Sequence, residues 1–177
     1  MTLVAVVDYS SIRPQIRSGD LLAWRRATPF AQLIRHWTGG SYSHVGIAWR
    51  FRGRLFVLQD KEKQGIDLVA LSDNLPCDWI RTDAAWTDEV EIEAMAHLGQ
   101  SYSLLNCVLA GLNIKPIGVR RICSEYAYGI LRAAGVMRSS SLSHHKDLYA
   151  KPVLNPSQLV NLLLDLGKTL ATVSNLA

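Results

Sequence analysis

The residues best suited to chemistry in this chain are a cysteine and a histidine that lie far apart in the sequence. Cys123 opens a segment that runs to Gly135 with amphipathic, helical spacing. A thiol in the first turn of a helix lies at the positive end of the helix dipole, and Arg120 and Arg121 stand directly before it. Both features favour thiolate over thiol, so we expect a lowered thiol pKa and a nucleophilic Cys123.

A histidine that could take the thiol proton stands at the head of an apolar, strand-like run. His44 lies in the sequence Ser-His-Val-Gly-Ile-Ala, residues 43–48. A cysteine at a helix start and a histidine on a strand are the minimum that thiol catalysis needs. The remaining histidines lie in expected helices or in a serine-rich loop and are interpreted as structural or solvated: His36, His97, His144 and His145.

Two other cysteines compete with Cys123, and neither has a comparable setting. Cys107 lies in an apolar, helix-like stretch, where a cysteine acts as a small hydrophobic residue, and Cys77 follows a proline in a loop. The three cysteines form no CxxC pair, which argues against a zinc site or a disulfide framework and favours a reducing compartment. We therefore expect no metal and no cofactor.

Composition predicts a single globular domain. The chain has 177 residues, of which 49% are hydrophobic and 19% charged, and its net charge of +4 is too small to argue for nucleic-acid binding. The N-terminus lacks the basic region of a signal peptide, and no apolar stretch reaches the roughly 18 residues that a membrane span needs. We expect a cytoplasmic protein without an integral membrane segment, which would reach an external substrate only through a phage or a secretion system.

Strands are predicted mainly in the first half of the chain and helices towards its end, which is typical of an α+β domain. The expected strands are residues 19–25, 42–51, 54–59, 66–71 and 79–81. The expected helices are residues 30–37, 90–98, 102–112 and 123–135, and a last helix that starts at 155–157.

These motifs, taken in order, resemble the circularly permuted branch of the NlpC-type, papain-like cysteine hydrolases. That branch includes YiiX-like bacterial proteins and the lecithin:retinol acyltransferase group. In the permuted branch the histidine precedes the cysteine, as it does here. The matching segments are Gly-Asp-Leu-Leu (19–22), Ser-His-Val-Gly-Ile (43–47) and Cys-Ser-Glu-Tyr (123–126), with weaker matches at 57–59, 65–66, 71–72 and 99–102.

The resemblance implies an α+β, permuted papain-like fold. In this fold a small antiparallel sheet bears the histidine and packs against helices, with the nucleophile at a helix N-terminus. We expect one such domain over residues 1–177, with its core at about residues 17–164.

The resemblance also implies a third polar residue that orients the imidazole, on the strand after the histidine strand. The matching position is Gln59, whose amide oxygen can accept from the imidazole N–H but carries no negative charge. Asp60 and Glu62 are the alternatives, although Asp60 should point to the opposite face of the strand. The predicted catalytic set is Cys123, His44 and Gln59.

Other polar residues near these motifs have smaller expected roles. The backbone N–H of Cys123 should help to bind the oxyanion, with Tyr42 or Tyr102 as candidates for a second donor. Asp20 should fix the turn before a strand, and Glu125 should cap the helix or pair with an arginine.

We expect a cysteine hydrolase that cleaves an amide, isopeptide or ester bond through a thioester. The resemblance implies a substrate that is a cell-wall peptide or an acyl-lipid-like molecule. Two alternatives stay open. A thiol acyltransferase would discharge the same thioester to an amine or alcohol, and a non-catalytic binding or structural module would keep only the fold.

Overall fold

A seven-stranded sheet forms the centre of the fold in the computed structural model, which describes residues 6–61, 65–99, 122–137 and 154–175. The strands lie in the order β1-β7-β6-β2-β3-β4-β5. Their bounds are β1 (Val6–Asp8), β2 (Leu21–Trp24), β3 (His44–Phe51), β4 (Arg54–Lys61), β5 (Gly65–Ala70), β6 (Cys77–Ile80) and β7 (Leu170–Ser174).

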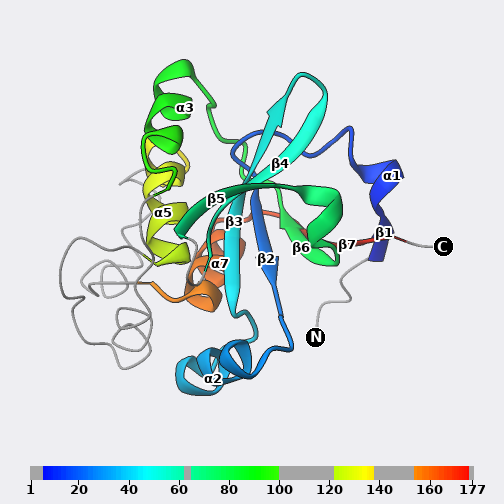
Figure 1. Cartoon of the computed structure of the whole chain (residues 1–177), viewed down its shortest axis with the longest axis vertical. Helices are drawn as coiled ribbons and strands as arrows, with labels where there is room; N and C mark the ends of the chain where they lie inside the picture. Colours follow the sequence, from blue (N-terminus) through cyan, green and yellow to red (C-terminus); the bar gives the residue numbers. More distant parts are fainter. Residues whose placement is uncertain (1–5, 62–64, 100–121, 138–153, 176–177) are drawn as a thin grey trace.

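Helices cover the sheet and one of its ends. They are α1 (Tyr9–Ile12), α2 (Pro29–Thr38), α3 (Asp88–Met95), α5 (Cys123–Ala133), α7 (Pro156–Asp165) and the 3-10 helix η1 (Leu71–Asn74). Helix α5 packs across β3 and β4 with α3 and α7 beside it, whereas α2 lies by itself below the ends of β2 and β3 (Figure 1). Within the described ranges, no helix has both the length and the apolar character to cross a membrane.

The predicted α+β class is confirmed, but the sheet is mixed and not purely antiparallel. All neighbouring strands are antiparallel except β1 and β7, which run parallel. Neither of these two strands was predicted. β1 has only 3 residues and β7 has 5, and most of their side chains are partly exposed, so neither shows the alternation that identifies a strand.

The other predicted elements within the described residues are found close to their expected places. The five predicted strands correspond to β2 through β6, and the helices to α2, α3, α5 and α7. Helix α1 was not predicted. The helix expected at 102–112 and the serine-rich loop at 139–145 lie outside the described residues.

The sheet separates two hydrophobic clusters. On one face, alternate residues of β3 (Val45, Ile47 and Trp49) pack with the buried sides of α5 and α7. On the other face, Leu22, Trp24 and Val57 pack with Ile12, Ile16 and Leu71. Because successive strand residues point to opposite faces, these clusters show which strand side chains face α5.

The loop that leads into β3 is held by the start of α7. Ser157 Oγ accepts a hydrogen bond from the Tyr42 backbone N–H at 2.8 Å and lies 3.3 Å from the Tyr42 carbonyl oxygen. Gly40 passes so close that a Cβ there would lie 2.2 Å from Ser157 Oγ and 2.5 Å from its Cβ. The loop therefore needs glycine at position 40 to reach this contact, which sets the position of the following strand.

A Gly40→Ala substitution should lower the free energy of unfolding by about 1–3 kcal/mol, because the added methyl group overlaps Ser157. Chemical denaturation measures this loss. A double-mutant cycle with Ser157→Gly, which removes the clashing atoms, should recover part of it. If Gly40→Ala costs the same in both backgrounds, the contact between the loop and α7 is not tight.

Candidate active site

Helix α5 begins at Cys123, as predicted. The preceding residue, Ile122, is extended, and its backbone N–H donates to Glu125 Oε2 at 3.0 Å. This contact is the capping role expected for Glu125, and it places a carboxylate in the first turn, where the helix dipole favours negative charge. Tyr126 and Ile130 are buried on the face toward the sheet, and Gly135 with φ of 76° follows the helix.

The Cys123 sulfur lies at the beginning of β3, where the pairing of β3 with β4 stops. The last paired residues are Gly46 and Gln59, and the Ala48 backbone groups bond toward the β2 side. Alternation along the strand therefore directs the Val45 N–H toward β4, beyond the end of the ladder. This N–H lies close enough to the Cys123 sulfur to oppose the effect of burial on the pKa of the thiol. The thiol is thus held against the residue that follows His44.

His44 and Gln59 form a hydrogen-bonded pair on the other face of these two strands. His44 Nε2 lies 2.7 Å from Gln59 Oε1, and both side chains are buried. Because Gln59 Oε1 can only accept, Nε2 carries the proton in this contact. The Trp24 ring packs against the imidazole with ring centroids 5.4 Å apart. The contact expected between His44 and Gln59 is therefore present, and the imidazole makes it through Nε2 and not through Nδ1.

Gly46 makes room for the glutamine side chain. A Cβ at Gly46 would lie 2.7 Å from Val57 Cγ1 and 3.1 Å from Gln59 Cβ. The glycine in the Ser-His-Val-Gly-Ile motif thus leaves room for the Gln59 side chain to extend past position 46 and contact His44.

Asp60 faces away from the imidazole, as strand alternation predicts, and this puts it on the side of α5 and the thiol. Its neighbour on that face, Leu58, packs in the same cluster as α5. Asp60 is 1% exposed, and its Oδ1 has no hydrogen-bond partner in the described part of the chain. Burial raises the pKa of Asp60 to about 7, and the negative charge of Glu125 contributes to the increase. The sequence did not indicate that this carboxyl lies near the nucleophile.

The Cys123 thiol is more weakly acidic than the sequence predicts. The residue is 4% exposed, and this burial raises its pKa to about 12. Asp60 raises it further, whereas the Val45 and Ser124 backbone N–H groups and the charge of Arg26 oppose the increase. Arg120 and Arg121, from which we expected a lowered pKa, lie outside the described residues. The expectation was wrong because the loss of water around a buried thiolate outweighs the nearby donors and the Arg26 charge.

A small pocket reaches the sulfur from the side of α2. Ile34 and Thr38 of α2 form one wall, and Asn155 and Pro156 at the start of α7 form another. Ser43 and Ile122 complete the lining around Cys123. Both helices that close this pocket begin with strong caps, since Thr28 Oγ1 accepts from the Ala31 N–H at 3.2 Å and Asn155 Oδ1 from the Gln158 N–H at 2.9 Å.

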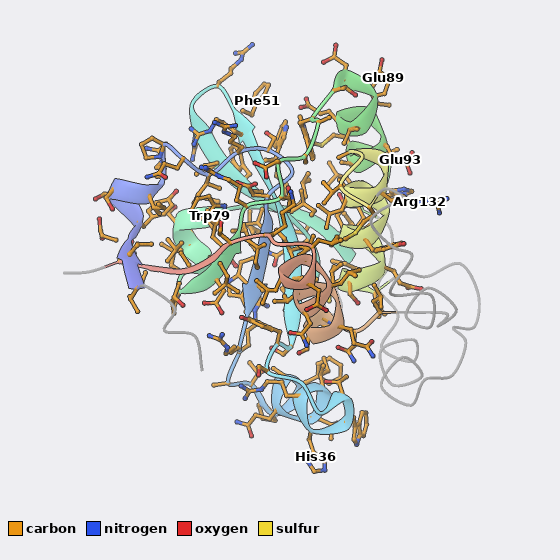
Figure 2. All side chains as sticks on the ribbon, turned by 180° about the vertical axis from the view of Figure 1, so that it is seen from behind. His36, Phe51, Trp79, Glu89, Glu93 and Arg132 are labelled. Carbon is orange, nitrogen blue, oxygen red and sulfur yellow. The ribbon has the colours of Figure 1, made fainter. Side chains whose placement is uncertain are left out.

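The remaining candidates have other roles. Tyr42 O–H donates to Asp78 Oδ2 at 2.6 Å, which makes it a poor oxyanion donor, and Tyr102 lies outside the described residues. Asp20 accepts from Trp79 Nε1 at 2.8 Å and fixes the start of β2. His36 is exposed at the far end of α2, away from the sheet, and Glu93 on α3 holds His97 at 3.1 Å (Figure 2).

Arg26 is the site residue that the sequence motifs did not indicate. Its Nη2 donates to Gln59 Oε1 at 3.3 Å, the same oxygen that His44 contacts. One signal was available. Trp24 pairs with His44 in the ladder, and side chains two residues apart on a strand share a face, which directs Arg26 toward the imidazole.

The side chains described here do not form a metal site. Within the described residues, no group of three or more His, Cys, Asp or Glu side chains lies close enough together to hold a metal ion. His44 Nε2 donates a hydrogen bond to the amide oxygen of Gln59. An amide lacks the charge of a carboxylate ligand. Among the residues that the structure describes, this site therefore offers no set of three metal ligands.

Comparison with solved structures supports the fold. The chain is similar to the crystal structure of the metalloprotein yiiX from Escherichia coli O157:H7, with a TM-score of 0.54, 18% sequence identity, and coverage of 70% of this chain and 69% of that one. A scan against protein-family models and a search of curated proteins found no match. The chain thus has a YiiX-like α+β fold, of the kind that the sequence motifs predicted.

Replacing Asp60 by asparagine should stabilise the protein above neutral pH. The folded pKa of Asp60, about 7, exceeds its ordinary value of 3.8. Protonated Asp60 therefore contributes stability that is complete below about pH 4 and is lost as the pH rises through 7. At pH 8, Asp60→Asn should raise the free energy of unfolding by about 2–4 kcal/mol, with little effect at pH 4.

Urea denaturation of both proteins at pH 4 and pH 8 measures this difference. The exposed Asp165 provides a control, because Asp165→Asn should change stability by less than about 0.5 kcal/mol at either pH. An Asp60→Asn effect that is equal at both pH values would mean that the carboxyl is not held out of water.

Proposed function

We propose that this protein is a cysteine hydrolase that cleaves an amide, isopeptide or ester bond through a thioester on Cys123. One observation carries the proposal. The Cys123 sulfur lies near the Val45 backbone N–H at the start of β3, and the preceding residue, His44, is held by Gln59 at 2.7 Å. The chain thus has a helix-start thiol beside Val45 and, at the preceding residue, an imidazole that a third residue holds, which are the groups that thiol catalysis needs.

In the proposed reaction, His44 acts first as a base and then as an acid. Gln59 holds the His44 imidazole on the other face of β3, so in the proposed reaction the side chain reaches around the end of the strand, where a ring nitrogen takes the proton of the Cys123 thiol as the sulfur attacks the carbonyl carbon. The bond to the amine or alcohol then breaks, and His44 returns the proton to this leaving group. Water, deprotonated by the same nitrogen, hydrolyses the thioester and restores the thiol.

The negative charge that forms on the carbonyl oxygen needs donors already in place. The first N–H groups of an α-helix have no partner within the helix, so we assign the Cys123 backbone N–H as a hydrogen-bond donor to this oxygen. The second donor that we expected, Tyr42, is engaged with Asp78 at 2.6 Å.

A buried thiol sets a condition on catalysis. With Cys123 only 4% exposed, a carbonyl group can reach the sulfur only when the walls of the small pocket part. The pKa of about 12 also means that the thiol carries its proton at neutral pH until His44 accepts it. Proton transfer and attack are therefore coupled in the proposed mechanism.

The proposed substrate class follows from the resemblance to the permuted family. It is a cell-wall peptide or an acyl-lipid-like molecule. An acyltransferase would use the same residues and differ only in the acceptor that attacks the thioester.

A non-catalytic module is the second candidate, and the state of the thiol favours it. Structural cysteines are buried and weakly acidic, as Cys123 is here. Cys77 provides an internal standard, because it is also a buried free thiol with a pKa raised to about 12. The two thiols differ in that Cys123 lies beside Val45, the residue after His44, whereas Cys77 packs in the cluster on the other face of the sheet.

If His44 acts as a base, iodoacetamide should alkylate Cys123 at least about tenfold faster than Cys77 at pH 7.5. Peptide mass spectrometry of the folded protein gives the rate at each cysteine. His44→Ala should bring the Cys123 rate down to that of Cys77 and leave the Cys77 rate unchanged. Equal rates in the unsubstituted protein would support the non-catalytic module.

The second test concerns the residue that orients His44. Gln59→Ala should slow alkylation of Cys123 by about tenfold or more, because the imidazole loses its partner. Gln59→Glu should retain or raise the maximal rate and move the pH profile to higher pH, since a carboxylate stabilises imidazolium and so raises the pH at which neutral His44 is available as a base. If Gln59→Ala leaves the profile in place while Asp60→Ala moves it, Asp60 takes over the role assigned to Gln59.

A further inference from the structure

A half-buried arginine lies beside the candidate nucleophile without a carboxylate to balance it. Arg26 follows β2, its Nη2 lies 3.3 Å from Gln59 Oε1, and its guanidinium lies 5.6 Å from the centre of the Trp24 ring. In the part of the chain that the structure describes, no aspartate or glutamate forms an ion pair with it. A cation that is partly removed from water and unpaired is costly, so this position favours an anion that the protein does not itself supply.

The Arg26 charge acts on the reacting sulfur. It lowers the pKa of the Cys123 thiol against the effect of burial, and burial in turn lowers the pKa of Arg26. The guanidinium is therefore within electrostatic reach of both the sulfur and the oxygen that holds His44. A group bound to Arg26 would lie next to Gln59, the residue that holds His44.

Arg26 also lines a large cavity at the end of β2. The cavity has a volume of about 500 Å³, within the range of small-molecule sites. Its polar lining comes from the end of β2 and from the segments beside it: Arg25, Arg26, Asn74, Asp78 and Thr172.

The charge balance of this cavity leaves one positive charge uncompensated. Arg25 Nη2 lies 2.5 Å from Asp78 Oδ2, so these two charges cancel. Asp78 is buried and also accepts from Tyr42 at 2.6 Å and from Thr172 at 2.5 Å, which fixes its carboxylate in place. Arg26 is thus the cation that remains for a ligand.

We propose that Arg26 binds a carboxylate of the substrate, so that the bond cleaved belongs to an acyl compound with a free carboxylate, such as an N-acyl amino acid or a peptide. This inference rests on the proposed function and specifies its substrate. A guanidinium pairs with a planar carboxylate through parallel hydrogen bonds. A single net positive charge matches a monoanion, whereas a phosphate dianion would leave one negative charge unbalanced in the cavity.

Binding of two probes that differ only in charge tests the proposal. N-acetylglycine and N-acetylglycinamide are titrated into the full chain carrying Cys123→Ser, and the arginine Nε–Hε signals are followed by NMR. The acid should move the Arg26 signal in a saturable way, and the uncharged amide should bind at least about tenfold more weakly. Added salt should weaken the binding of N-acetylglycine, because it screens the charge interaction with Arg26.

Two arginine variants separate the roles of the neighbouring charges. Arg26→Gln should lower the affinity for N-acetylglycine at least about tenfold, whereas Arg25→Gln, which removes the same charge from a pair with Asp78, should change it less than about twofold. Equal binding of acid and amide, or full affinity in Arg26→Gln, would overturn the proposal. Tighter binding of methyl phosphate than of N-acetylglycine would assign the site to phosphate instead.

The outcome is independent of the proposed hydrolase activity. The binding protein lacks the thiol, so a failure to bind the acid leaves the alkylation of Cys123 as a valid test of the nucleophile. Conversely, slow alkylation of Cys123 together with tight binding of the acid would keep the carboxylate site and reject the enzyme.

Discussion

The arrangement of this site depends on the point at which β3 and β4 stop pairing. The ladder ends at Gly46 and Gln59, and the next N–H along β3, that of Val45, turns to the Cys123 sulfur instead of to a strand. An unpaired backbone donor in the interior is costly, and the packing of α5 on β3 brings the Cys123 sulfur next to this N–H. The sheet edge and the helix N-terminus are therefore joined through the nucleophile itself.

The same strand separation divides the polar side chains between two faces. Gln59 and Asp60 are consecutive on β4, so one meets His44 and the other lies on the side of the thiol. The two neighbours act in opposite directions. Gln59 holds the imidazole that would accept the proton, whereas ionised Asp60 makes the thiol harder to deprotonate. The Arg26 charge partly offsets Asp60, so the acidity of Cys123 is set by a balance that extends over three strands.

The surrounding contacts hold this balance in place from outside the site. Ser157 at the start of α7 fixes the loop before His44, and Asp20 fixes the start of β2 through Trp79. The pair of Arg25 and Asp78 leaves Arg26 as the uncompensated cation of the cavity. None of these residues touches the sulfur. Each one limits where the charged and reactive groups can lie.

The sequence by itself determined the local elements and the kinds of residues at the site. The spacing of residues 30–37 indicated α2, and alternation along β4 put Gln59 and Asp60 on opposite faces. The order of His44 and Cys123 pointed to the YiiX-like fold that the comparison supports. These predictions succeeded because caps, turns and strand alternation are properties of neighbouring residues.

Tertiary structure decided the electrostatics and the long-range pairings. The parallel pair of β1 and β7 joins the two ends of the described chain, and no local pattern specifies it. The predicted acidity of Cys123 was wrong, since burial raises its pKa to about 12. The positions of Asp60 and Arg26 near the sulfur were also not evident from the sequence. Desolvation and charge interactions depend on groups brought together from distant segments, so they follow from the folded arrangement and not from residue spacing.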